Sequence, residues 1–229
     1  LGNVIGSNIA NIGLILGISL VIKPIETKGV IPTSQIFLLF GLTIFFSIAL
    51  IIQGDQGIGW GIGSILLIYI FAYLFFITLG AIRSSTVSHE TNENGHSNPV
   101  ILSLVMIVFA TIALWVGSDA LVFGAKNFAL SAGIPEELIG FTLIALGTSL
   151  PELAASLALL KKGESGMLLG NVLGSNMFNI GLVGGVAGVL GPVLSNTPYP
   201  WIDYLFMILL TALFCFWLRG RKIEKKEGY

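Results

Sequence analysis

The chain alternates between long apolar stretches and short polar segments. Seven stretches meet or approach the length of about 20 residues that a helix needs to cross ~30 Å of hydrocarbon. They lie at residues 1–22, 36–53, 58–81, 99–131, 136–160, 166–190 and 200–218. The segments between them are rich in Pro, Gly, Asn and Ser, which favour loops. This pattern predicts an all-α, polytopic membrane bundle with about seven spans in this chain.

The fourth stretch is too long for a helix that crosses the bilayer at right angles. Its apolar part ends near Gly117, and the polar residues Ser118, Asp119, Lys126 and Asn127 follow. The stretch is therefore either one strongly tilted helix or a helix broken in two.

One apolar segment occurs twice. The sequence LGNVIGSNIANIGLILG at residues 1–17 recurs 168 residues later as LGNVLGSNMFNIGLVGG, with 12 of 17 positions identical, which indicates a duplicated membrane unit. Duplication kept only for close helix packing would explain the repeated Gly and Ser residues. It does not explain the amides, each of which costs free energy in hydrocarbon without a partner. The repeated amides are Asn3, Asn8 and Asn11, which recur as Asn171, Asn176 and Asn179.

The positions of Lys and Arg predict the direction of each span, because basic residues accumulate on the cytoplasmic side. With seven spans, one side receives 10 of the 11 basic residues and the other receives only Lys126. Residue 1 then lies outside, the C-terminal tail is cytoplasmic, and the two copies of the repeat run in opposite directions. The predicted organisation is three spans of a first repeat at 1–81, a cytoplasmic loop at 82–98, and four spans of an inverted second repeat at 99–229. Inverted repeats are typical of alternating-access carriers.

The composition agrees with a membrane protein: 55% of the residues are hydrophobic, 10% are charged, and the mean hydropathy is +0.93. A net charge of −1 provides no basic field for nucleic acid. The single cysteine, Cys215, excludes a disulfide within the chain and is expected to pack as a small apolar residue. His89 and His96 lie in a polar loop, where we expect them to be solvated.

The strongest chemical signal is the sequence ALGTSLPELAAS at residues 145–156, inside the fifth stretch. Pro151 has no amide hydrogen, and its ring conflicts with the carbonyl four residues earlier, so the helix should break around Gly147. The break releases the carbonyls of Gly147 and Thr148 from helical pairing, and Ser149 adds a hydroxyl at the same level. Glu152 adds a carboxylate that costs about 2.5 to 3.5 kcal/mol to insert at this depth, which marks it as a functional residue.

The candidate ligands in these segments are all oxygen atoms, from carboxylate, hydroxyl, amide and main-chain carbonyl groups. Oxygen ligands suit hard cations such as Ca²⁺, whereas zinc and copper sites require Cys or His. Ser7 and Asn11 are four residues apart, as are Ser175 and Asn179, so each pair lies on one helical face and can point into a common cavity.

Two motifs resemble a known family. GTSLPE, followed 18 residues after its Glu by GNVLGSNMFN, is similar to the second α-repeat of the cation/calcium exchanger superfamily, and GNVIGSNIAN is similar to the latter half of the first. The resemblance implies a secondary active antiporter, not an enzyme, that exchanges Ca²⁺ for Na⁺ by alternating access. Its partners would be the two ions and the lipid bilayer, with no resident cofactor. The implied metal-binding positions are Thr148, Ser149, Glu152, Ser175, Asn179, Ser7 and Asn11, with the main-chain oxygen of Ala145 as a weaker candidate.

The first repeat departs from the family pattern because it has no GTSLPE segment. If the repeat spacing holds, a second Glu would lie about 18 residues before Gly2, on two further helices, and a final helix would follow the second repeat. We therefore expect these 229 residues to be a fragment that holds half of a carboxylate pair and cannot transport alone.

Two other functions are compatible with parts of this pattern. A proton-coupled exchanger of calcium or another divalent cation would use Glu152 as its titrating group. A membrane enzyme such as an intramembrane protease is more distant, because HExxH, paired aspartates on the spans and a Ser/His pair at depth are missing. The loop at 82–98 has no room for the large regulatory insert of animal exchangers, which suggests a prokaryotic inner-membrane protein. The amide at Asn179, where potassium-dependent relatives tend to carry an acid, favours exchange without K⁺.

Overall fold

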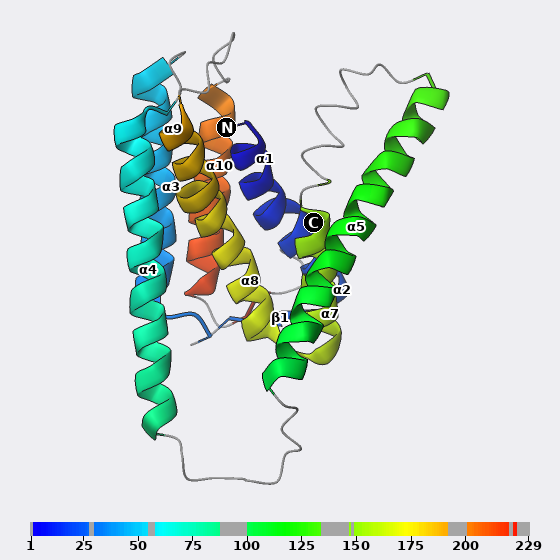
Figure 1. Ribbon diagram of the computed structural model, residues 1–229, viewed down its shortest axis with the longest axis horizontal. Coiled ribbons are helices and arrows are strands. Elements are labelled where there is room, and N and C mark those ends of the chain that lie inside the picture. Colours follow the sequence, from blue (N-terminus) through cyan, green and yellow to red (C-terminus); the bar gives the residue numbers. More distant parts are fainter. Residues whose placement is uncertain are drawn as a thin grey trace.

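The computed structural model describes residues 2–27, 30–54, 58–87, 100–133, 147, 149–191, 201–219 and 222–223. The secondary structure is almost entirely helical, which confirms the predicted fold class (Figure 1). The elements in chain order are α1 (Gly2–Ala10), η1 (Asn11–Leu16), α2 (Gly17–Ile22), β1 (Ile25–Glu26), α3 (Thr33–Gln53), α4 (Trp60–Val87), α5 (Val100–Ser131), α7 (Leu150–Lys162), α8 (Ser165–Phe178), η3 (Asn179–Gly184), α9 (Gly185–Leu190), α10 (Trp201–Leu218) and β2 (Lys222–Ile223).

Six of the seven predicted spans are confirmed as helices long and apolar enough to cross a membrane. The seventh, predicted at 136–160, lies largely outside the described residues, and α7 is its described part. Helix α4 continues to Val87, into the segment predicted as a loop, whereas the apolar span within it ends at Ile82. The fourth span is one continuous helix of 32 residues, α5, rather than two. Figure 1 shows α5 inclined to α4.

Each copy of the repeat contains a π-helical segment that the sequence did not predict. In the first copy η1 begins at Asn11, and in the second η3 begins at Asn179, the matching position. Both π segments have six residues and continue directly from an α-helix into another. Because π segments inside α-helices occur mostly at functional sites, their matched placement points to the amides at which they begin.

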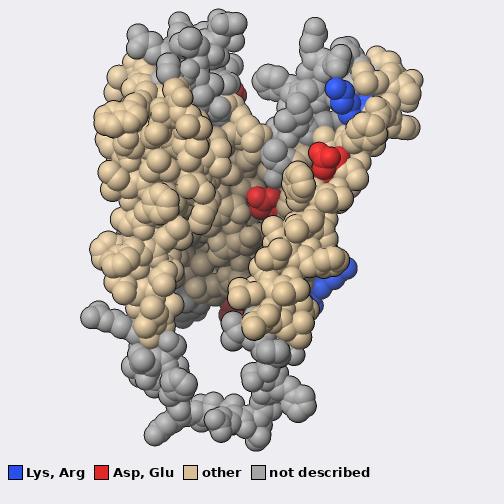
Figure 2. Space-filling view, viewed as in Figure 1, with Lys and Arg blue, Asp and Glu red and all other residues tan. Residues whose placement is uncertain are grey.

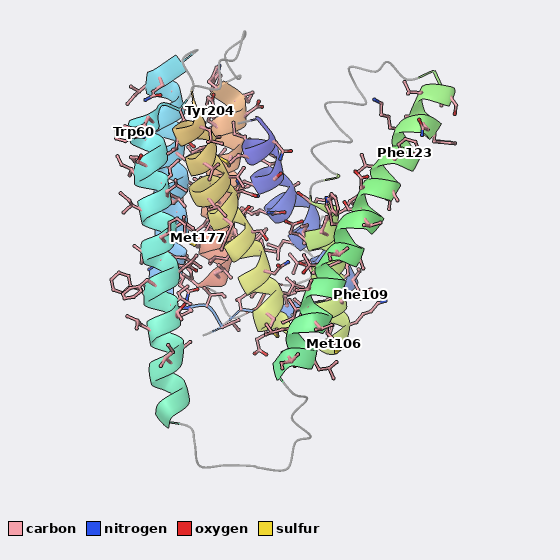
Figure 3. All side chains as sticks on the ribbon, viewed as in Figure 1. Trp60, Met106, Phe109, Phe123, Met177 and Tyr204 are labelled. Atoms are coloured by element: carbon pink, nitrogen blue, oxygen red, sulfur yellow. The ribbon has the colours of Figure 1, made fainter. Side chains whose placement is uncertain are left out.

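The core lies between α3, α4, α8 and α10, where Phe46, Met177 and Phe214 are fully buried (Figure 3). Helices α4 and α9 approach closely at glycines. A Cβ atom on Gly63 would lie 2.7 Å from the carbonyl oxygen of Gly185 and from the backbone nitrogen of Val189. Small residues allow this contact, which fixes α9, and with it η3, against α4.

Among the membrane spans of the described residues, α5 is the most exposed, and of the described elements it contacts mainly α7. Phe109 and Phe123 are 73% and 68% exposed and project away from the other helices (Figure 3). Few charged side chains appear among the described residues on the face shown in Figure 2, and many large apolar side chains of the described residues are exposed. Such a surface is compatible with lipid and would promote aggregation in water.

A two-residue β-bridge joins the segment after the first span to the segment after α10. Strands β1 and β2 are antiparallel, with Ile25 opposite Ile223. The Thr27 hydroxyl donates to the carbonyl oxygen of Trp217 at 3.2 Å. The sequence analysis predicted no strands here. The bridge places these two segments at the same end of the bundle, as the distribution of basic residues requires.

The close contact at Gly63 predicts a position-specific loss of stability. Replacing Gly63 by Ala forces the α4 and α9 backbones apart, and we expect it to lower the free energy of unfolding by about 1–3 kcal/mol. Thermal unfolding in detergent measures the change. Gly61 on the same helix is the matched control, because a Cβ there meets nothing within 4 Å. Equal losses for Gly63→Ala and Gly61→Ala would contradict the packing of α4 on α9.

Candidate cation site

The helix breaks next to Pro151 as predicted. Helix α7 begins at Leu150, and Ser149 before it has non-helical backbone angles, φ −99° and ψ 0°. Gly147 is the residue whose carbonyl would accept the hydrogen that Pro151 lacks. That carbonyl accepts a hydrogen bond from the Ser118 hydroxyl of α5 instead, at 2.7 Å. The prediction that this carbonyl is released from helical pairing is therefore correct, and the released oxygen has a partner on α5.

The contact between α5 and this segment also leaves no space for a side chain at position 147, which is glycine. A Cβ atom there would overlap Cγ2 of Val122, one helical turn after Ser118 on α5. Helix α5 thus lies directly against the broken segment. A cavity of about 320 Å³, lined by residues of α5 and α7, adjoins this contact. Thr148 and Ala145, two of the predicted oxygen donors, lie outside the described residues.

Two buried oxygens at the start of α7, one on the residue before it and one in its first turn, have no hydrogen-bond partner in the described part of the chain. One is Oε2 of Glu152, whose side chain is half-buried, and the other is Oγ of Ser149, whose side chain is 2% exposed. An unpaired carboxylate oxygen in such surroundings carries a desolvation cost that a bound cation would offset. Oε2 of Glu152 is therefore buried against protein, in a position where a cation could supply its missing partner.

The second copy of the repeat packs against this turn. Asn171 of α8 donates from Nδ2 to Oγ of Ser156 at 3.0 Å and to the carbonyl oxygen of Glu152 at 3.4 Å. One turn further along α8 lies Ser175, which is half-buried like Asn179. The backbone N–H of Asn179 donates to the carbonyl oxygen of Ser175, so the predicted shared face of these two residues is confirmed.

The first copy of the repeat reaches the same region from the opposite direction. Ser7 and Asn11 are buried, at 4% and 1% exposure, and η1 packs against both α7 and α8. Nδ2 of Asn11 donates to Oδ1 of Asn176 at 3.3 Å, which joins the two copies directly. The structure therefore brings the helices of Glu152, Asn11 and Ser175 into one packed cluster.

Two residues that contribute to this region were not among the predicted metal-binding positions. Ser118 pairs with the broken helix, and Asn176 pairs with Asn11. Asn176 carried a signal, since it is one of the repeated amides, whereas Ser118 carried none beyond its polarity in an apolar stretch. Asn8, the counterpart of Asn176, donates to the carbonyl oxygen of Val4 in its own helix at 2.6 Å.

The candidate cation ligands carry little negative charge. Within the described ranges, no group of three or more His, Cys, Asp or Glu side chains gathers in a way that could hold a metal ion. What the described residues offer is one carboxylate with hydroxyl and amide oxygens around it. Such a set suits a hard cation that binds weakly enough to leave again.

Comparison with known proteins identifies the family. A sequence profile described as "Sodium/calcium exchanger protein" matches residues 1–79 and 102–229. The chain belongs to the sodium/calcium exchanger family. The resemblance noted from GTSLPE and GNVLGSN is therefore confirmed. Families of this kind consist of transporters rather than enzymes.

Several relatives show how far the similarity extends. An uncharacterized membrane protein of Methanocaldococcus jannaschii is 36% identical over 229 residues, which is 100% of this chain and 71% of that protein. The putative antiporter CaxA of Alkalimonas amylolytica is 32% identical, over 99% of this chain and 73% of its own length. The sodium/calcium exchanger MaX1 of Methanosarcina acetivorans is 37% identical over 50% of this chain and 33% of its own.

Solved structures agree with these relatives. The chain superposes on the sodium-calcium exchanger NCX_Mj with a TM-score of 0.78 and 36% identity, over 99% of this chain and 70% of that one. Other structures of NCX_Mj were obtained from crystals soaked with Na⁺ and Sr²⁺, at TM-scores of 0.77. At 36% identity, this likeness shows that the chain shares the helical fold of that exchanger over the residues that superpose.

The hydrogen bond from Ser118 predicts a cost for its removal. Ser118→Ala removes the hydroxyl that donates to the Gly147 carbonyl oxygen, and we expect a loss of about 1–3 kcal/mol in the free energy of unfolding. Thr111→Val is the control, because the Thr111 hydroxyl bonds only to Ile107 of its own helix, and we expect a change within about 0.5 kcal/mol. Chemical unfolding in mixed micelles measures both. Equal stabilities would show that α5 is not held to the break by this bond.

Proposed function

We propose that this protein is a secondary active antiporter that exchanges Ca²⁺ for Na⁺ across a membrane by alternating access. The observation that carries the proposal is the buried, unpaired Oε2 of Glu152, at a helix break packed against both inverted copies of the repeat. Membership of the sodium/calcium exchanger family supports the same function.

The proposed ion cage consists of oxygens from both copies. Glu152 supplies the negative charge, and hydroxyl and amide oxygens complete the coordination. The second copy contributes Thr148, Ser149, Ser175 and Asn179, and the first contributes Ser7 and Asn11. Ca²⁺ and Na⁺ compete for overlapping positions in this cage, because both are hard cations that oxygen atoms bind. Competition couples the two fluxes.

Charge balance enforces the coupling. A loaded cage is close to neutral, whereas an empty cage leaves the Glu152 carboxylate unpaired in an apolar interior. Closing the site requires burying whatever charge it holds, so the empty transporter is held back from switching. We infer that α5 is the moving element, because it is the most exposed helix and packs mainly on α7.

A second candidate is a proton-coupled exchanger of calcium or another divalent cation. The similarity to the putative antiporter CaxA supports this second candidate. In that case protons would neutralise Glu152 in place of Na⁺. Calcium flux that follows a pH gradient and ignores sodium would select this function.

We further propose that the protein lies in a prokaryotic inner membrane with its C-terminal tail in the cytoplasm. The asymmetry of basic residues supports this orientation. The β1–β2 bridge supports it as well, since it joins two segments that both belong on the cytoplasmic side.

Neutralising the carboxylate tests the proposed function. In the full-length protein reconstituted into vesicles, we expect Glu152→Gln to reduce sodium-dependent calcium uptake to background while leaving the folded state intact, because the cage loses its charge. Glu164→Gln is the matched control, since Glu164 is exposed at the start of α8. Calcium uptake by Glu152→Gln at the wild-type rate would refute the proposal.

The amide at Asn179 leads to a second expectation. Sodium/potassium/calcium exchanger 4 of Homo sapiens is 37% identical to this chain over 90 residues, which is 38% of this chain and 14% of that protein. Because an amide adds no negative charge, we expect replacement of K⁺ by choline to leave calcium uptake unchanged. A requirement for K⁺ would show that the amide does not decide potassium dependence.

A further inference from the structure

A buried amide pair connects the two copies of the repeat at the candidate site. Asn11 is the first residue of η1, and Asn176 lies in α8, one turn before η3. Both side chains are 1% exposed, and Nδ2 of Asn11 donates to Oδ1 of Asn176 at 3.3 Å. The pair joins residues 165 positions apart in the chain, so it is a contact between the two copies and not within one helix.

This bond decides which end of the Asn11 amide remains available. Asn11 offers its NH₂ group to Asn176, and its own Oδ1 is buried without a partner among the described residues. A cation binds the oxygen end of an amide and is repelled by the NH₂ end. The terminal torsion of Asn is soft, so the amide can present either end when nothing holds it. In the observed arrangement Oδ1 of Asn176 is the acceptor for this amide, and Nδ2 of Asn176 is likewise buried without a partner among the described residues.

The counterpart of Asn176 in the other copy does something different. Asn8 is equally buried, but its Nδ2 donates to the carbonyl oxygen of Val4 within α1. Two positions with the same residue, burial and place in the repeat therefore have different partners. The bond from Asn11 to Asn176 is thus not explained by the repeat itself, and Asn8 provides a matched comparison.

We propose that Asn176 is a positioning residue for ion binding. Its Oδ1 fixes the Asn11 amide so that the Asn11 carbonyl oxygen faces the transported cation. This inference rests on the proposed function, because it assigns Asn11 to the ion cage. Residues that orient a metal ligand typically change metal affinity by about 10- to 100-fold when they are replaced.

The experiment measures half-saturating Na⁺ and Ca²⁺ concentrations, and maximal rates, for exchange by the full-length protein in vesicles. The variants are Asn176→Leu, Asn11→Leu, the double variant and the control Asn8→Leu, each shown to be folded by its unfolding temperature and size-exclusion profile. We expect Asn176→Leu to raise the half-saturating concentration of at least one ion by about tenfold or more, with a smaller change in maximal rate. Asn8→Leu should change neither concentration more than about twofold.

The double variant tests whether Asn176 acts through Asn11. If it does, Asn11→Leu with Asn176→Leu is no more impaired than Asn11→Leu alone, since the positioned oxygen is already gone. Asn176→Asp, which keeps an acceptor at the same place, should bind the affected ion at least as well as the wild type. Additive effects of the two Leu substitutions, or equal impairment by Asn176→Leu and Asn8→Leu, would overturn the inference. Loss of affinity in Asn176→Asp as large as in Asn176→Leu would also overturn it.

These outcomes are separable from failure of the proposed function. If the wild type exchanges Na⁺ for Ca²⁺ and Asn176→Leu matches it, the positioning role fails and the exchanger function stands. If the wild type shows no sodium-dependent calcium uptake, the proposed function itself fails.

Discussion

Holding the Glu152 carboxylate inside an apolar bundle is the constraint to which the rest of this structure responds. A charged oxygen at that depth is stable only with a partner, and the described residues leave one of its two oxygens unpaired. The helix break beside Pro151, and the Asn171 amide of α8 that donates to the main-chain carbonyl of Glu152, supply polar groups next to this residue. A bound cation would pair with the carboxylate, and its release would leave the buried carboxylate unpaired again. The free energy of the site therefore depends on whether a cation is bound.

The duplicated segments meet this constraint from two directions. In each copy a helix changes from α to π geometry at an asparagine, at Asn11 and at Asn179. One inter-copy hydrogen bond joins Asn11 to Asn176, and glycine contacts such as Gly63 on Gly185 fix the surrounding helices. Helix α5 stands apart from this packed group, since it presents mostly exposed apolar residues and rests on α7. Such a division between a tightly packed group and a loosely packed helix is what a carrier needs to change access without losing its site.

Much of this architecture could be predicted from the sequence, because hydrocarbon imposes strong and simple rules. Span length and the missing N–H of Pro151 both depend on local chemistry. The structure confirms the six spans and the helix break that they predicted. The distribution of basic residues is a third local rule. The contacts that could not be predicted join distant parts of the chain. Nothing local indicates that Ser118 donates to Gly147, or that Asn11 selects Asn176. The extension of α4 to Val87 was missed because polar residues at a helix end resemble a loop in sequence.

The most direct test is to locate the cation. Crystals of the full-length protein soaked in Sr²⁺ at low Na⁺ should show an anomalous peak about 2.3 to 2.6 Å from the Glu152 carboxylate, the distance range expected for a Ca²⁺-like ion bound by oxygen. The peak should also lie within reach of the Asn11 carbonyl oxygen and disappear when Na⁺ is raised. A cation bound elsewhere, with the Glu152 side chain turned toward lipid, would contradict the assignment of the transport site.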